Sequence, residues 1–144
     1  MNTFLPYADF NRSAEVLDRQ RLGKQRLECL QIVRTLMGES DGWHNRPAVL
    51  MWDGYVQSLL EYGCAVCNEW MCRGYRDSIG EQLLSYVKGV KPVPPPWLGD
   101  ERFHSSHRSN LLRKDPVHYS KYAWSEPPTL PYFWPTKEPA YAES

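Results

Sequence analysis

The stretch DRQRLGKQRLECLQIVRTLMG, residues 18–38, decides the fold class of this chain. Asp18 at its start is a typical helix N-cap, and Gly38 at its end is a typical C-terminal stop. Between them, apolar side chains recur at the period of an α-helix and define a core-facing side, formed by Leu22, Cys29, Leu30, Val33, Leu36 and Met37. The sequence therefore predicts a helix from residue 18 to about residue 37.

Similar signals on both sides of this stretch predict four further helices. Their expected ranges are 9–17, 47–74, 78–87 and 101–114. Either Asp9 or Ser13 is suited to cap the first, and Pro47 is typical of a first helical position. Gly54 and Gly63 each weaken a helix by roughly 1 kcal/mol relative to alanine, so they indicate close packing or a bend within 47–74.

The C-terminal half is interrupted by proline. Residues 91–99 hold four prolines and are predicted to form an extended connector. Residues 125–144 combine proline with aromatic residues and are predicted to pack as an irregular tail. The expected architecture over residues 1–144 is a mainly α, compact, single-domain helical bundle with this irregular C-terminal segment.

Charge and hydropathy limit the possible functions. Seventeen basic and seventeen acidic residues cancel, so net charge gives no general support for nucleic-acid binding. Basic residues are nevertheless concentrated at 12–34 and at 102–121, which predicts two local basic surfaces. The sequence has neither a long apolar run nor a secretory signal, so we expect a cytoplasmic monomer without membrane contact.

Four cysteines raise the question of a metal or redox site. Cys64 and Cys67 have the Cys-x-x-Cys spacing, but a structural zinc site normally needs a second pair of ligands. The two residues fall in the middle of a predicted helix, which favours free thiols. We expect neither a metal nor a cofactor.

The polar side of the helix at 18–37 carries a second pattern. Its residues lie along one stripe at helical spacing: Arg21, Lys24, Gln25, Glu28 and Gln31. Cations favour the charged form of a neighbouring carboxylate and burial favours the neutral form, so Glu28 is a candidate for proton transfer. Taken alone, a solvated helix face with charge pairs explains the stripe better. Arg26 falls on the apolar side, which is unusual for a surface helix.

Residues 103–114, FHSSHRSNLLRK, are rich in groups that donate hydrogen bonds to phosphate. His104, His107 and Arg108 share one helical line. Histidines at this spacing can also bind a metal, but the sequence nearby offers no carboxylate or cysteine that completes a ligand set. We expect phosphate or sugar contacts, with Arg21, Lys24, His107, Arg108 and Lys114 lining one DNA-facing surface.

Residues 17–28, LDRQRLGKQRLE, resemble the early helix of the pyrimidine-dimer DNA glycosylases, the endonuclease V-like family, whose catalytic glutamate falls where Glu28 stands. The sequence is more similar to bacterial relatives of that family. Those relatives share the opening Met-x-Thr-Phe-Leu-Pro-Tyr and the stretches LGKQR at 22–26, MWxGY at 51–55 and SHRSNLLRKDP at 106–116.

The resemblance implies a DNA repair enzyme that acts on duplex DNA. In that chemistry an N-terminal α-amine attacks C1′ of a damaged nucleotide, a glutamate supports base loss and imine formation, and β-elimination cuts the strand. The expected catalytic residues are Glu28 with Met1 or Asn2. The expected DNA contacts are Gln20, Arg21, Lys24, Gln25, Arg26, Arg46, His104, His107, Arg108 and Lys114.

The start of the chain leaves the nucleophile open. The bulk of Asn2 normally blocks removal of Met1, so the amine is that of Met1, or that of Asn2 if processing occurs. Without either, Glu28 would activate water. Arg46 stands where the bacterial relatives tend to have histidine, so the choice of lesion is open. Two other functions remain alternatives: a non-catalytic nucleic-acid-binding module, and a hydrolase acting on another modified base or a nucleoside.

Overall fold

The computed structural model describes residues 1–40, 42 and 44–135 and confirms the predicted mainly α class. Within these residues the chain forms seven α-helices, one 3-10 helix and no strand. The elements are α1 (Phe10–Val16), α2 (Arg19–Leu36), α3 (Pro47–Leu50), α4 (Val56–Cys72), α5 (Ile79–Leu84), α6 (Glu101–Lys114), α7 (Pro116–Tyr119) and η1 (Ser120–Tyr122).

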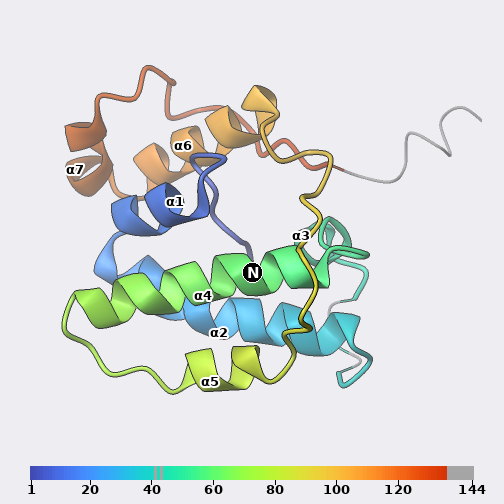
Figure 1. The fold of residues 1–144 in the computed structure, drawn as a ribbon. Coiled ribbons are helices and arrows are strands. Elements are labelled where there is room, and N and C mark those ends of the chain that lie inside the picture. The colour runs from blue at the N-terminus through green and yellow to red at the C-terminus, as the bar shows by residue number, and fades with distance from the viewer. Residues whose placement is uncertain (41, 43, 136–144) are drawn as a thin grey trace, which may run out of the picture.

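The helices pack around α4, which contacts α1, α2 and α5. Figure 1 shows α2, α4 and α5 together in one half of the molecule and α1, α6 and α7 in the other half, with the N-terminus near the centre. The largest fully buried side chains are aromatic and come from several elements: Trp52, Tyr62, Phe103 and Tyr119. The core is therefore built from residues far apart in the sequence.

Side-chain caps fix the starts of the helices that lead to the site. Asp9 accepts a hydrogen bond from the Arg12 amide, and Asp18 accepts one from the Arg21 amide. Such caps stabilise a helix by roughly 1 kcal/mol each. Gly38 follows α2 with a φ of +78°, a conformation that favours glycine. The predicted start and end of the helix containing Glu28 are confirmed.

The predicted long helix from Pro47 is wrong in one respect, because the structure divides it in two. α3 ends at Leu50, and α4 begins only at Val56. Gly54 lies between them with a φ of +87°, which breaks the helical path. The break allows Trp52 to enter the core, where it is fully buried.

Gly63 in α4 permits a close approach between helices. A Cβ atom at this position would lie 2.9 Å from Leu83 Cδ1 and 3.3 Å from Cys29 Cβ. Glycine is therefore needed where α4 meets both α2 and α5. Met37 was expected on the core side, but its side chain is 46 % exposed because α2 has already ended at Leu36.

The connector at 91–99 and residues 125–135 of the C-terminal segment contain no α-helix, as predicted. The connector is not extended throughout, because residues 96–99 form a turn in which the Leu98 amide donates to the Pro95 carbonyl. Hydrogen bonds from residues 125–135 to two serines of α6 hold this segment against the helix. Ser109 Oγ accepts from the Leu130 amide at 2.9 Å, and Ser106 Oγ accepts from the Phe133 amide at 3.1 Å. Residues 136–144 of the predicted tail lie outside the described residues.

The cysteines are placed as the sequence predicted. All four cysteines are free thiols, with Cys64 and Cys67 in the middle of α4 as predicted. Across residues 1–40, 42 and 44–135, no three His, Cys, Asp or Glu side chains are grouped so as to hold a metal ion. Within the same ranges, no helix has the length and apolar character needed to cross a membrane.

Candidate active site

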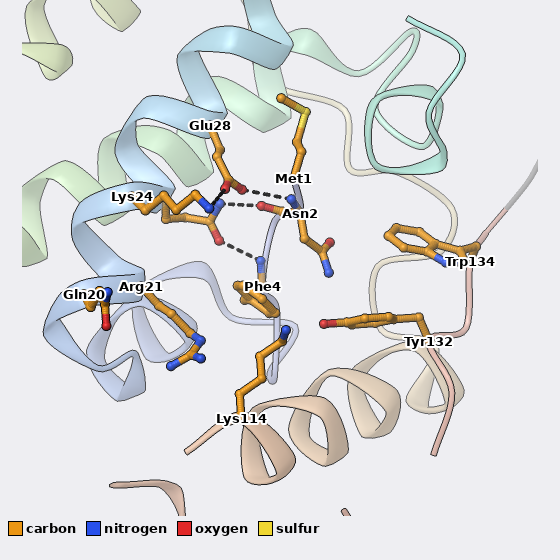
Figure 2. A pocket seen from close by; sticks show the side chains of 11 residues that line it. Met1, Asn2, Phe4, Gln20, Arg21, Lys24, Glu28, Lys114, Tyr132 and Trp134 are labelled. Atoms are coloured by element: carbon orange, nitrogen blue, oxygen red, sulfur yellow. Dashed lines mark hydrogen bonds and ion pairs between the residues drawn. The ribbon is translucent and has the colours of Figure 1, made fainter. Parts of the chain in front are cut away.

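The N-terminal segment, residues 2–7, is irregular chain that packs against α2 and bends from Pro6 onward. Its Asn2 amide donates to Glu28 Oε2 at 2.8 Å. Gln25 Nε2 donates to the Asn2 carbonyl at 2.7 Å, and Gln25 Oε1 accepts from the Phe4 amide at 2.7 Å. Figure 2 shows these bonds joining the first residues of the chain to α2. Glu28 is thus in direct contact with main-chain nitrogen near the N-terminus.

Side chains from other elements bind the rest of this segment. Trp52 Nε1 donates to Thr3 Oγ1 at 3.0 Å, and the Tyr62 hydroxyl donates to the Phe4 carbonyl. Thr3 and Leu5 are fully buried. A buried backbone without a neighbouring strand must find other hydrogen-bond partners, and here they are side chains. The segment is therefore held firmly, although chain ends usually fray.

A pocket of about 400 Å³ opens where the N-terminal segment crosses α2. Its lining residues are Met1, Asn2, Phe4, Gln20, Arg21, Lys24, Gln25, Glu28, Lys114, Tyr132 and Trp134. Of these, Glu28 is the one carboxylate, and Arg21, Lys24 and Lys114 are cations. Lys24 Nζ lies 3.6 Å from Glu28 Oε1. The pocket therefore combines a carboxylate, main-chain nitrogen and a cationic rim.

Two aromatic side chains form the wall opposite α2. Figure 2 shows Tyr132 and Trp134 entering the pocket from that side, with the Tyr132 hydroxyl directed inward. The two ring centroids are 5.4 Å apart and the rings are inclined by 38°. Burial raises the pKa of Tyr132 above its ordinary value, so this phenol stays neutral and able to donate a hydrogen bond. Phe133, between them, does not line this pocket.

The structure brings together eight of the residues that the sequence selected. Met1, Asn2, Gln20, Arg21, Lys24, Gln25, Glu28 and Lys114 all line the pocket. Gln25 needs a correction, because its amide is 1 % exposed and both of its polar atoms bind the chain's own backbone. Its expected DNA contact is therefore replaced by a structural role.

Arg26 and Arg46 lie away from the pocket lining. Arg26 Nη1 pairs with Asp77 at 2.6 Å, and its guanidinium lies 4.4 Å from the Trp70 ring centroid. These contacts explain why a cation occupies the apolar side of α2, and they favour a structural role for Arg26 over the expected DNA contact. Arg46 is exposed at the start of α3.

The two histidines of α6 correct the prediction of surface phosphate contacts, because both are buried. His107 Nδ1 accepts from the Leu5 amide at 2.9 Å, and His104 Nδ1 lies 2.7 Å from the Leu5 carbonyl. Because the Gly99 amide donates to His104 Nε2, the ring proton of His104 sits on Nδ1 and is donated to that carbonyl. The predicted single DNA-facing surface is therefore wrong for His107.

Arg108, like the two histidines, binds the backbone of the N-terminal segment. Its Nη1 donates to the Pro6 carbonyl at 2.7 Å, and its guanidinium pairs with Glu126 at 2.8 Å and with Glu101. The side chain is 11 % exposed. Arg108 therefore joins the N-terminal and C-terminal segments, and these bonds favour a structural role over the expected DNA contact.

The buried histidines make stability depend on pH. Burial lowers the pKa of His104 and lowers that of His107 to about 3, compared with an unfolded value near 6.5. A depressed folded pKa gives stability that is present above pH 6.5 and is lost as the pH falls. One pH unit corresponds to about 1.4 kcal/mol. The lowered pKa of His107 should therefore reduce the free energy of unfolding by about 2 kcal/mol between pH 6.5 and pH 5.

Urea unfolding across pH 5 to 7.5 checks this expectation. The lowered pKa values of Asp18, Asp77 and Glu126 act in a more acidic range, so this window isolates the histidines. His107→Asn cannot titrate and should flatten the slope. A free energy of unfolding that stays constant from pH 7.5 to 5 would contradict the assignment.

Sequence reasoning missed Phe4, Tyr132 and Trp134 in the pocket. For the aromatic residues of the tail, the sequence predicts only irregular packing. No local pattern says which of several aromatic side chains meets a helix encoded far earlier in the chain. A search for aromatic residues at alternating positions near the C-terminus would have selected Tyr132 and Trp134 together.

Comparison with known proteins bears on this arrangement. A family model described as pyrimidine dimer DNA glycosylase matches residues 1–80, more than half of the chain. The chain belongs to the pyrimidine dimer DNA glycosylase family. No curated protein and no solved structure was found to match it. As a member of this family, the protein is a DNA repair glycosylase.

The range matched by the glycosylase family model divides the site. It includes the N-terminal segment, Gln25 and Glu28. Helix α6 and the wall formed by Tyr132 and Trp134 lie beyond residue 80. The part of the pocket formed by Lys114, Tyr132 and Trp134 therefore lies outside the residues that the family model matches, and its placement comes from the structure alone.

Proposed function

We propose that the protein excises a damaged or modified pyrimidine from duplex DNA, using a main-chain amine at the N-terminus as the nucleophile and Glu28 as the proton-transferring group, and then cuts the abasic strand. The observation that carries the proposal is the 2.8 Å contact between Asn2 N and Glu28 Oε2 inside a pocket with a cationic rim. The family supports base excision, and this contact supports the assignment of roles.

The chemical steps follow from those groups. The amine nitrogen forms a bond to C1′ while the bond from C1′ to the base breaks, and the base leaves with the electron pair. Glu28 takes a proton from the attacking amine, which yields an imine once the sugar ring opens. Loss of a C2′ proton then expels the 3′ phosphate, which is the lyase step. An α-amine suits this role because it is less basic than a lysine amine.

The nitrogen in contact with Glu28 favours one choice of nucleophile. In a chain that retains Met1, Asn2 N is an amide and cannot attack. Removal of Met1 would turn the same atom into a terminal amine already 2.8 Å from the carboxylate. We therefore assign the nucleophile to Asn2, in a form of the protein from which Met1 has been removed, although the bulk of Asn2 normally disfavours that step.

The cationic rim suits the phosphates of a duplex. Arg21 pairs with Asp18 at 3.1 Å, which fixes its guanidinium at the edge of the pocket. Lys24 and Lys114 are exposed and approach from two different helices. Each phosphate neutralised by such a group makes binding more sensitive to salt.

Tyr132 and Trp134 are placed to stack on a base taken out of the duplex. Stacking of a base on an aromatic side chain contributes about 1–3 kcal/mol. Trp134→Ala is therefore expected to weaken binding to lesion-containing DNA about tenfold while leaving affinity for undamaged duplex unchanged. Phe133→Leu is the control, because Phe133 lies outside this pocket with Arg102 over its ring. Equal losses on both duplexes would remove the aromatic wall from lesion recognition.

The proposed activity is tested by incubating the protein with duplexes that each carry one defined lesion or an abasic site, and measuring base release and strand cutting. Release from at least one damaged pyrimidine is expected. Binding without release on every duplex would indicate a non-catalytic module. Release from free nucleosides with little salt dependence would indicate a nucleoside hydrolase.

A further inference from the structure

Helix α6 holds the N-terminal segment at three consecutive backbone groups. His107 Nδ1 accepts from Leu5 N at 2.9 Å, His104 Nδ1 donates to Leu5 O at 2.7 Å, and Arg108 Nη1 donates to Pro6 O at 2.7 Å. These three side chains, called here the α6 anchor, share one face because they occupy positions i, i+3 and i+4 of the helix. They lie beyond the residues that the family model matches.

The anchor acts on the same segment that reaches Glu28. Leu5 is three residues from Asn2, and between them Gln25 binds Asn2 O and Phe4 N. The segment is thus fixed at one end by α2 and at the other by α6. A shift of Leu5 along the N-terminal segment would move Asn2 N relative to Glu28. Displacements of about 1 Å between reacting groups can lower a reaction rate about a hundredfold.

The anchor is itself held rigidly. His104 and His107 are 2 % and 0 % exposed, and the His107 ring packs against Phe103 with centroids 4.3 Å apart. Each histidine is fixed as one tautomer by its bond to Leu5. Within the described residues, His107 Nε2 is buried without a hydrogen-bond partner, so the ring is held by its Nδ1 contact with Leu5 N and by its aromatic packing.

We propose that His104, His107 and Arg108 are positioning residues that set the location of Asn2 N against Glu28 through their bonds to Leu5 and Pro6. This inference rests on the proposed function. It reassigns the donor-rich stretch of α6 from binding phosphate to aligning the nucleophile. Loss of the anchor should therefore lower the rate of chemistry and leave DNA affinity unchanged.

Two substitutions at His107 separate this role from general stability. Asparagine places its amide oxygen near the position of Nδ1 and keeps an acceptor for Leu5 N. Glutamine places its polar atoms near Nε2 and loses that acceptor. The expected single-turnover excision rate falls tenfold or more in His107→Gln at saturating duplex, with the dissociation constant within twofold of wild type. His107→Asn should retain most of the rate.

A second measurement does not depend on activity. Hydrogen exchange of the Leu5 amide should accelerate in His107→Gln and stay slow in His107→Asn. If His107→Gln fails to fold, Arg108→Met compared with Arg108→Lys provides the same contrast at Pro6 O, because lysine keeps one donor. Equal excision rates in the members of a pair, or equal losses in both, would overturn the inference.

The outcomes also distinguish this inference from the proposed function. A wild-type protein that releases no base defeats the proposed function, whereas slow Leu5 exchange would still establish the anchor. An active wild type with an unaffected His107→Gln variant defeats only the positioning role.

Discussion

Replacing Glu28 by glutamine is expected to lower the rate of base excision at least about a hundredfold while leaving the fold intact. Glutamine keeps an oxygen that can accept from Asn2 N, so the segment should remain in place, but it cannot take a proton from the amine. Base release in single-turnover assays measures the effect, and thermal unfolding checks the fold.

Glu61→Gln is the matched control, because Glu61 is an exposed carboxylate on α4 outside this pocket. Binding adds a second comparison. A non-catalytic module would only gain affinity when a negative charge near phosphate is lost, whereas an enzyme loses turnover. Near-normal excision by a folded Glu28→Gln protein would remove Glu28 from the mechanism.

Blocking the N-terminal amine is expected to abolish imine formation. The protein beginning at Asn2 can be compared with the same protein acetylated at Asn2 and with one carrying a short uncleaved tag before Met1. An acetylated nitrogen has lost its nucleophilic electron pair to the amide, so borohydride should trap no covalent complex with DNA. The dissociation constant for duplex DNA should change little, because the cations Arg21, Lys24 and Lys114 remain.

The form that retains Met1 is informative in the same series. Its nitrogen in contact with Glu28 is an amide, so its trapping should fall well below that of the form beginning at Asn2. Intact-mass measurement of each preparation confirms which terminus is present. Trapping that is equal in the acetylated and free forms would rule out the terminal amine and point first to Lys24, one helical turn before Glu28.

The sequence predicted those features that depend on local chemistry. Asp18 and Gly38 fixed the limits of α2 because caps act over a few residues, and the stripe containing Arg21, Lys24 and Glu28 followed from helical spacing alone. The same reasoning failed where a long-range contact decided the outcome. Pro47 indicated the start of a helix, but Gly54 broke it to let Trp52 reach the core.

Donor-rich stretches were the hardest to interpret. His104, His107 and Arg108 carry groups suited to phosphate, and their type does not reveal whether they face DNA or the chain's own backbone. The deciding partner is the N-terminal segment, about a hundred residues earlier in the sequence. Arg26 is comparable, since its unexpected place on the apolar side is explained by Asp77 and by the Trp70 ring, both far from it in the sequence.

Borohydride trapping followed by peptide mapping tests the central claim most directly. The protein beginning at Asn2 is incubated with the duplex from which it releases a base, reduced, digested and analysed by mass spectrometry. The account predicts a sugar adduct on the main-chain nitrogen of Asn2, and much less adduct in Glu28→Gln. An adduct on the side chain of Lys24, or base release with no adduct at all, would contradict it.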